Sequence, residues 1–571
     1  MKKLLFLFLI FQYLCFTSFA QEINKHISYT TIYDYLDELA NMGVIELNSA
    51  VKPYTYILIG EKLKEAETKK EMLTVRQQKD LAFFLKDYNK LYDTEDHSTF
   101  LWKEYSKPNP AGKYFKKRLD LFYYRDSLFA FTLNPIMGAT YSENKNGTAW
   151  QRWWGAEMNG TIGKHFGFYF NIRDNGFKNL LISPDYLTQA PGANLKPSSN
   201  GKADFDDARG GISYGWKWGT ISLLKDNFSW GNNYNGSNIF SGRQPSFAYL
   251  HYKLKPAKWL EYNYIHGSLI SEILDSSRTY GMGSSLRQDF IPKYMAANLA
   301  TIRFTKKLFV SIGNSIVYAD KYIQPIYLIP FMFYPSADHT QSGAGSNAVG
   351  ENSQMFLDVS CRNIPKTNLY GTVFVDEIDL AKMFKPHEQT NFVSLKAGIR
   401  FTNLFIKNTS FTFEYTRTNP WVYVHPISSI TFASNNYNMG NYLGQNSDEL
   451  YGGIKVKPLR GVTLDAGLSW ARKGQVLAYQ QINGINNNAG TPFMQNIQWQ
   501  NKSLLLKAQF EIINDVFIFA SCTIQDITGT TYGIETYSPA FYYGNTATVN
   551  GVKVPTNGYT ITMMGGLNWG F

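Results

Sequence analysis

The chain has 571 residues and a net charge of +11, with 16% aromatic and only 18% charged residues. The length allows one large domain or several small ones. The positive charges are scattered rather than gathered in blocks, which favours solvated lysines over a nucleic-acid-binding surface. Charge alone leaves acidic polysaccharide and lipid head groups as partners and argues against nucleic acid.

The first twenty residues have the pattern of a cleavable secretory signal. Lys2 and Lys3 precede the apolar run Leu4–Phe11, and small residues stand before a cut at Gln21. Cys15 follows a leucine where a small residue is required, so we reject a lipoprotein anchor. Cleavage removes two lysines and leaves 551 residues with a charge of +9. The sequence therefore predicts an exported protein.

The region after the signal has helical periodicity. The signs of three helices are the spacing of Ile32, Tyr35, Leu36 and Leu39 with Gly43 behind it, the segment Tyr56–Ala66, and a capping box of Thr74 and Gln77. Their apolar faces can pack against each other or against the neighbouring domain. We leave both arrangements open.

After Gln21 no stretch of 18 consecutive apolar residues occurs, which excludes a membrane-spanning helix. The other structure that crosses a bilayer is a closed β-barrel, in which every backbone N–H and C=O is paired within the protein. Its sequence sign is a series of segments of about ten residues with alternating hydrophobicity, separated by turns.

Such alternation runs through most of the chain and is clearest near its C-terminus. Residues two apart in a strand point to the same face, so one parity meets lipid and the other an aqueous lumen. The apolar parity includes Tyr559, Ile561, Met563, Leu567, Trp569 and Phe571, then Leu464, Leu468 and Trp470, Leu504, Leu506 and Phe510, Met355 and Leu357, and Phe166, Phe168 and Phe170. Charged residues recur on the other parity, because a charge facing lipid costs roughly 2–4 kcal/mol near the midplane.

The spacing of turns predicts the topology. Short turns stand at 125–127, 163–165, 256–258, 306–307, 365–367, 458–460 and 514–515, and long polar stretches lie near 177–206, 269–291, 320–350, 425–447, 472–497 and 527–557. Tight periplasmic turns and extended outer loops are typical of outer-membrane barrels. We count about 18 candidate strands after Lys116, and an even number is the rule for such barrels.

Few patterns indicate catalysis or metal binding. Asp204, Asp206 and Asp207 offer oxygen ligands without an EF-type loop, and Asp338 with His339 offers an acid–base pair without a nucleophile pattern. We find no zinc motif and no phosphate-binding loop. After cleavage only Cys361 and Cys522 remain, which leaves one bridge open but makes no disulfide framework. We expect no catalytic residue, no metal and no cofactor.

Several motifs, taken in their order along the chain, resemble the Wzi family of capsule-assembly outer-membrane lectins. They are Tyr35–Leu39 with Gly43–Ile45 and Lys52–Tyr54, Lys225–Gly231 with Pro245–Phe247, Tyr327–Phe331, Leu369–Gly371 with Asp376 and Glu377, and Glu414–Arg417 with Trp421–Tyr423, His425, Tyr442–Gly444 and Ser447-Asp448. The resemblance runs from about residue 30 to the C-terminus. The sequence departs from the family pattern between Asp338 and Asn352 and in the 472–497 loop.

The resemblance implies an 18-stranded barrel with a periplasmic helical bundle, a role in holding polysaccharide at the cell surface, and no enzyme activity. The predicted divisions are a signal peptide at 1–20, a periplasmic helical domain at 21–98 and an outer-membrane barrel at 99–571. We expect capsular or exopolysaccharide, outer-membrane lipid and the barrel assembly machinery as partners, and a monomer. The alternatives are a porin, a surface adhesion or gliding-motility protein, and a barrel hydrolase using Asp338 or His339.

Candidate ligand contacts lie in the predicted outer loops. Aromatic faces stack on sugar rings, while amides and charged groups bond the hydroxyls. We predict polysaccharide contacts at Trp230, Tyr234, Tyr437, Tyr442 and Asn446, against the alternative of interface girdles and ordinary loop chemistry. Glu414, Arg417 and Asp448 are predicted to form a lumen network, for which structural salt bridges are favoured over a ligand site.

Overall fold

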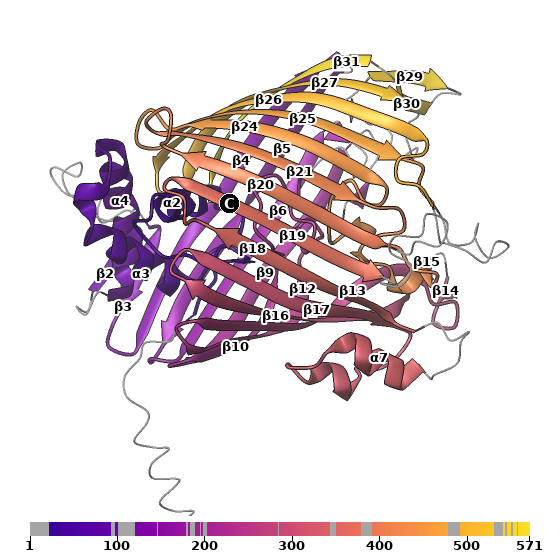
Figure 1. Ribbon diagram of the computed structural model, residues 1–571, viewed down its shortest axis with the longest axis horizontal. Coiled ribbons are helices and arrows are strands. Elements are labelled where there is room, and N and C mark those ends of the chain that lie inside the picture. Colours follow the sequence, from indigo (N-terminus) through magenta and orange to yellow (C-terminus); the bar gives the residue numbers. More distant parts are fainter. Residues whose placement is uncertain are drawn as a thin grey trace, which may run out of the picture.

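Eighteen long strands, each antiparallel to its neighbours in chain order, form a closed barrel in the computed structural model (Figure 1). This confirms the predicted fold class and strand number. The structure describes residues 22–92, 97–100, 120–145, 147–178, 181–182, 189–194, 196–197, 202–283, 285–342, 350–377, 391–477, 491–529, 541–542, 545–549, 552–556 and 558–570. The predicted signal peptide and Phe571 lie outside these residues.

The long strands form the wall of the barrel. They are β4 (Phe129–Asn144), β5 (Gly147–Ile162), β6 (Phe166–Lys178), β9 (Lys202–Trp216), β10 (Gly219–Asp226), β12 (Phe247–Ala257), β13 (Leu260–Leu274), β16 (Phe290–Thr305), β17 (Leu308–Ala319), β18 (Asn352–Cys361), β19 (Thr367–Glu377), β20 (Phe392–Thr402), β21 (Thr409–Thr418), β24 (Ser447–Val456), β25 (Val462–Gly474), β26 (Ile497–Ile513), β27 (Val516–Gly529) and β31 (Gly558–Trp569).

The remaining elements are short. The helices are α2 (Thr30–Asn41), α3 (Tyr56–Glu67), α4 (Val75–Tyr88), α7 (Tyr334–Ser342) and the 3₁₀ turns η1 (Lys70–Met72), η2 (Asn89–Tyr92), η5 (Pro325–Leu328) and η6 (Ser428–Ile430). The short strands are β1 (Val51–Lys52), β2 (His97–Phe100), β3 (Phe122–Arg125), β7 (Leu181–Ile182), β8 (Lys196–Pro197), β11 (Ser229–Trp230), β14 (Tyr280–Met282), β15 (Ser285–Arg287), β22 (Ala433–Ser434), β23 (Tyr437–Asn438), β28 (Phe541–Tyr542), β29 (Asn545–Val549) and β30 (Val552–Thr556).

The last strand closes the wall against the first. β31 pairs with β4 from Trp569 opposite Met137 to Met563 opposite Glu143. β3 pairs with the start of β4, and β2 pairs with β3, so these two short strands extend the sheet beyond the end of β31. Closure leaves no free strand edge in the wall, as a structure in hydrocarbon requires.

The two ends of the barrel differ. We call the end covered by α2, α3 and α4 the helix end, and the opposite end the loop end (Figure 1). Every short turn predicted from the sequence lies within two residues of an observed turn between consecutive strands at the helix end. The long predicted loops connect strands at the loop end, which confirms the predicted division into short turns and long loops.

The two faces of the wall follow the predicted alternation. In β31, Met563 and Leu567 are 62% and 58% exposed on the outside, whereas Thr560 and Thr562 are 1% and 3% exposed on the inside. The outward parity of β25 likewise presents exposed Leu464, Leu468 and Trp470. An apolar outer belt of this kind is the surface that lipid contacts in a membrane barrel.

All three predicted N-terminal helices are present. Thr74 and Gln77 form the predicted capping box at the start of α4. Gly43 ends α2 because it adopts a φ of +75°, and its N–H donates to Ala40 O at 3.0 Å. The apolar stripes meet in one core, which contains Leu36, Leu39, Ile59, Leu63 and Leu81 among others. The helices therefore pack on each other, and polar contacts attach them to the barrel.

Buried charges make that attachment. Arg362, in the turn between β18 and β19, donates to Asn41 Oδ1 at 2.7 Å, to Ser49 Oγ at 2.9 Å and to Asp37 Oδ1 at 3.4 Å. Near the β24–β25 turn, Lys457 Nζ lies 3.3 Å from Glu38 Oε2. Arg76 and Gln77 of α4 also donate to the Glu38 carboxylate. Charge pairs removed from water hold geometry tightly once every partner is satisfied.

Replacing Arg362 with Met should loosen the helical region. The change leaves Asp37 and its polar neighbours buried without their cation, and breaking a buried pair in this way costs about 3–5 kcal/mol. Limited proteolysis of the micellar protein should then cleave residues 30–88 much faster than in the parent. The matched control is Arg278→Met, which breaks an exposed pair with Asp275 in a loop-end segment away from the helices and should cost little stability. Equal rates in the two variants would contradict the assignment.

The helical region should also weaken in acid. Burial tends to raise the pKa of Glu38, but Lys457, Arg76 and their hydrogen bonds outweigh it and lower the pKa to about 2. A pKa below the ordinary value of 4.5 stabilises the fold above that pH, and the contribution is lost as pH falls through about 2. The temperature of the unfolding midpoint, followed by circular dichroism at 222 nm, should therefore decrease as the pH is lowered from 4.5 to about 2. In Glu38→Gln the midpoint should change little over the same pH interval. A decrease as large as that of the parent protein would exclude Glu38 as the cause of the acid sensitivity.

Candidate functional site

Two long loops fold back into the barrel instead of extending from the loop end. The first plug loop (residues 227–246) joins β10 to β12, and the second plug loop (residues 419–446) joins β21 to β24. They bond to each other inside the wall, since Ser241 N–H donates to Met439 O at 2.7 Å and the Tyr423 hydroxyl donates to Asn238 O at 2.6 Å. A closed wall around such loops encloses a plug rather than an open channel.

The plug has a hydrophobic core of its own. The rings of Phe240 and Phe432, one from each plug loop, lie 5.3 Å apart, and Phe356 and Phe374 of the wall pack against them. Trp230 is 1% exposed within this core. Its strand β11 pairs with β1, so the plug is bonded to the N-terminal region as well. Trp230 therefore has both ring faces covered by protein.

Glu414 anchors the tip of the first plug loop to the wall. It lies on the inner parity of β21, as predicted, and is 2% exposed. Lys396 Nζ donates to it at 2.8 Å and the Tyr370 hydroxyl at 2.5 Å. The backbone N–H groups of Tyr234 and Asn235 donate to it at 2.6 and 3.1 Å. Four donors satisfy this buried carboxylate, which indicates the structural role favoured from the sequence.

Tyr234 is held deep in the barrel by the same arrangement. The Arg400 guanidinium lies 4.1 Å from the centre of its ring, and Tyr370 meets the ring edge-on. Burial raises the pKa of the Tyr234 hydroxyl above its ordinary value. Asn368 reaches the same hydroxyl at 3.4 Å. Tyr234, like Trp230, is thus part of the plug.

The predicted lumen network is not brought together by the fold. Arg417 shares the outward parity of Phe413 and Tyr415, and its guanidinium lies 3.9 Å from the centre of the Phe493 ring. Asp448 is opposite Arg417 in the sheet and accepts from Arg472 Nε at 2.8 Å. Arg417 and Asp448 therefore lie near the loop end of the outer face, and Glu414 alone of the three faces the lumen.

The other three predicted contacts lie together in or beside the second plug loop. Tyr437 packs against Gly192, and its hydroxyl accepts from Ala193 N–H at 3.4 Å. The Tyr442 hydroxyl donates to Glu449 at 2.8 Å. Asn446 is buried and accepts from Met494 N–H at 3.0 Å, so it serves to hold the loop. Tyr437 and Tyr442 keep partly exposed rings.

Sequence reasoning missed several residues of the plug. The pairing of Lys396 with Glu414 could have been predicted, because Lys396 lies on the inner parity of the adjacent strand. Asp358 of β18 accepts from both the backbone and the side chain of Asn232 at 2.7 Å. Arg243 lies 5.8 Å from the ring centre of Tyr442. The last two contacts join segments whose proximity no local pattern reveals.

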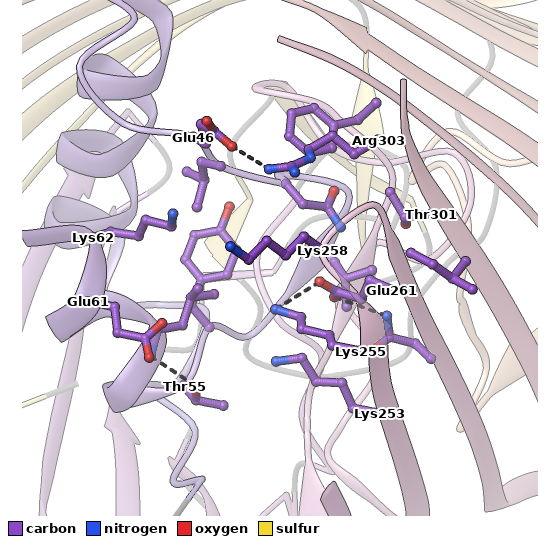
Figure 2. Close-up of a pocket in the computed structure, with 18 of the residues that line it drawn as sticks. Glu46, Thr55, Glu61, Lys62, Lys253, Lys255, Lys258, Glu261, Thr301 and Arg303 are labelled. Carbon is purple, nitrogen blue, oxygen red and sulfur yellow. Dashed lines mark hydrogen bonds and ion pairs between the residues drawn. The ribbon is translucent and has the colours of Figure 1, made fainter. Parts of the chain in front are cut away.

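A charged cavity of about 310 Å³ lies at the helix end, between α3 and the β12–β13 turn (Figure 2). Glu46 pairs with Arg303 across it, and Lys255 pairs with Glu261 at 3.0 Å. Figure 2 shows Lys258 reaching into the space, where it has no ion-pair partner among the described residues. The other lysine and arginine side chains around the cavity form ion pairs with acidic side chains. The cavity lining therefore mainly joins the helical region to the wall.

Other candidates for chemistry are separated by the fold. Asp207 pairs with Arg209, while Asp204 and Asp206 have the opposite parity of β9. Asp338 accepts from Glu351 N–H at 2.9 Å, on a helix outside the wall. Cys361 and Cys522 are both free. The described ranges contain no group of three or more acidic, histidine or cysteine side chains placed to hold a metal. Among the described residues, no helix combines the length and the hydropathy that crossing a bilayer requires.

The fold is that of the outer-membrane β-barrels, with an internal plug and a helical cap. Among solved structures it is similar to Wzi of Escherichia coli, an outer-membrane protein involved in Group 1 capsule assembly and described as a carbohydrate-binding β-barrel. That match covers 97% of this chain and 100% of Wzi at a TM-score of 0.55 and 11% identity. The predicted resemblance is therefore confirmed for the fold.

Two further solved structures match less closely. Pseudomonas aeruginosa OpdK, solved with vanillate, has a TM-score of 0.41 and 9% identity over 77% of this chain and 98% of its own. Acinetobacter baumannii OccAB2 has a TM-score of 0.40 and 8% identity over the same shares of the two chains. No protein-family model matches the sequence. No curated protein matches it either.

The plug should be released by removing Lys396. Lys396→Met leaves Glu414 buried without its cation, which costs about 3–5 kcal/mol. At tenfold per 1.4 kcal/mol, loop opening should become roughly 10²- to 4 × 10³-fold more frequent. Planar-bilayer recordings should be silent for the parent and show openings for the variant.

The control for this experiment is Arg472→Met, which breaks the pair with Asp448 on the outer face and leaves the plug intact. It should stay silent. Steady conductance in the parent, or equal openings in the two variants, would contradict a plug held by Glu414 and Lys396.

Proposed function

We propose that this protein is a non-enzymatic outer-membrane protein that binds capsular or exopolysaccharide and anchors it at the cell surface. The observation that carries the proposal is the plug. Two loops and the N-terminal region meet in a hydrophobic core inside the wall. An interior occupied in this way favours a surface-binding role over a passage for solutes.

The proposed orientation follows from the two ends. Outer-membrane barrels have tight turns toward the periplasm and longer loops outside. The helical region at 21–98 is accordingly assigned to the periplasm and the loop end of the 99–571 barrel to the exterior. A cleavable signal at 1–20 fits export to this location. Insertion by the barrel assembly machinery into outer-membrane lipid, as a monomer, completes the proposal.

The proposed binding surface is the outer part of the second plug loop. Tyr437 and Tyr442 have partly exposed rings, and Asn436 beside Tyr437 is exposed. Rings supply stacking faces for sugars, and amides supply donors and acceptors for hydroxyls. Trp230 and Asn446 are left out of this surface because they are buried, and Tyr234 because Glu414 and Arg400 hold it inside the plug. Repeated weak contacts along one polymer add up by multivalency.

The fold similarity supports the same ligand class. Wzi, matched over its full length, is described as carbohydrate-binding and involved in capsule assembly. Capsule retention and surface adhesion or gliding share this physics, and a deletion strain separates them. Loss of cell-bound capsule with normal motility is the outcome that the proposal requires.

Trimming the aromatic faces should weaken polysaccharide retention. Immobilised protein should retain polysaccharide from the producing cell, and Tyr437→Ser with Tyr442→Ser should reduce retention severalfold, at about 0.5–1.5 kcal/mol per lost stacking contact. The control is Tyr280→Ser, which removes an exposed tyrosine from another loop. A parent protein that retains no polysaccharide, together with unchanged capsule in the deletion strain, would overturn the proposal.

A further inference from the structure

One loop leaves the loop end and lies against the outside of the wall. This strap (residues 320–342) connects β17 to the segment before β18 and contains η5 and α7. Figure 1 shows α7 outside the barrel, where it packs beside β17 and β18. The strap and the outward faces of β13, β16 and β17 share a buried cluster that includes Tyr264, Ile316, Tyr318, Tyr327 and Tyr334.

Under the strap the outer face of the wall carries polar side chains beside this hydrophobic cluster. His266, Asn298 and Asn314 lie on the parity that presents apolar side chains elsewhere, yet each is at least nine-tenths buried. On the same three strands, outward Phe304 and Ile312 beyond the strap are 62% and 58% exposed. Uncovered polar groups on a lipid-facing wall cost free energy, so this patch is built to be covered.

The polar patch satisfies the backbone of the strap. Asn298 Nδ2 donates to Met332 O at 2.8 Å, and the Tyr264 hydroxyl donates to Tyr327 O at 2.8 Å. Tyr334 N–H donates to Asn314 Oδ1 at 2.9 Å. The Tyr262 hydroxyl donates to Pro330 O. A loop in water has no need of such partners, whereas backbone in hydrocarbon must find all of them within the protein.

The outer face of the middle of the strap is apolar, whereas polar side chains, which include Lys321, Ser336, His339 and Thr340, are exposed toward its ends. Leu328, Ile329, Phe331 and Phe333 are 42%, 47%, 68% and 51% exposed. This surface continues the exposed wall at Phe304 and Ile312. The ring of Phe331 lies 4.6 Å from the ring of Tyr262, which is the third residue of β13 from the helix end. The strap thus covers the wall far from the loop end where it begins.

The depth of the strap can be bounded from the register. Tyr262 lies opposite Ala300, which lies opposite Ile312 of β17, seven residues before Ala319. At about 3.3 Å per residue this is roughly 23 Å along the strand. Strand tilt reduces the vertical distance, but the apolar band of such barrels is only about 25 Å tall. The tip of the strap therefore falls within the hydrocarbon layer of a membrane at that band.

We propose that the middle of the strap (residues 326–333) is an intramembrane part of the barrel, whose Leu328, Ile329, Phe331 and Phe333 contact the acyl chains of the outer leaflet. This inference rests on the proposed outer-membrane location. It removes residues 326–333 from the loops that meet polysaccharide. It also makes this sector of the wall two layers thick, with a polar seam between the layers.

Nitroxide labels can test the position of the strap. In a Cys361→Ser, Cys522→Ser background, a single cysteine replaces Phe331, Leu468 or Tyr280 in protein reconstituted in phosphatidylcholine–phosphatidylglycerol vesicles. Leu468 is an exposed outward residue of the wall, and Tyr280 is exposed at the loop end. Heat-dependent gel migration checks that each variant is folded.

Collisions with oxygen and with a neutral nickel chelate report the environment of each label. The inference predicts that Phe331→Cys matches Leu468→Cys within about twofold, with oxygen favoured over nickel as in hydrocarbon. A label at 331 that matches the one at 280 would overturn it, as would a label shielded from both agents by a second copy of the chain. If the label at 468 also behaves as in water, the membrane location itself fails, and the proposed function fails with it.

Discussion

The fold depends on one constraint, which is that backbone polar groups in hydrocarbon have no water to bond. A closed antiparallel wall meets this constraint, and the pairing of β31 with β4 removes the last free edge. Once the wall is closed, each strand has one face toward lipid and one toward the lumen. The alternation of Met563 and Leu567 with Thr560 and Thr562 follows directly from that geometry.

The same constraint explains where the alternation fails. In β16 and β17 the inward side chains Met295, Leu299 and Val317 are apolar, while outward Asn298 and Asn314 are polar. The inward faces meet the hydrophobic core of the plug rather than water. The outward faces meet the strap rather than lipid. Polar and apolar side chains are thus mixed on both faces here, because the wall meets protein on both sides, and the side chains still match what they touch.

The sequence predicts the parts of the structure that depend on local pattern. Period-two alternation, turn spacing and helix caps such as Thr74 with Gln77 specify the wall, its two ends and the helices. The plug is harder, because Trp230 stands among asparagines and looks like a surface loop residue, while its partner Phe356 is 126 positions away. The outward position of Arg417 could have been predicted from the sequence, since its parity in the strand differs from that of Glu414. Contacts between distant segments carry no such local sign.

We propose that the protein is a plugged barrel that works at its outer surface, with the second plug loop as the contact for polysaccharide. Hydrogen-exchange mass spectrometry of the micellar protein, with and without polysaccharide from the producing cell, tests this most directly. We expect slower exchange in peptides covering residues 419–446 and unchanged exchange in the helices at 30–88. No protection anywhere, or protection confined to the helix end, would contradict it.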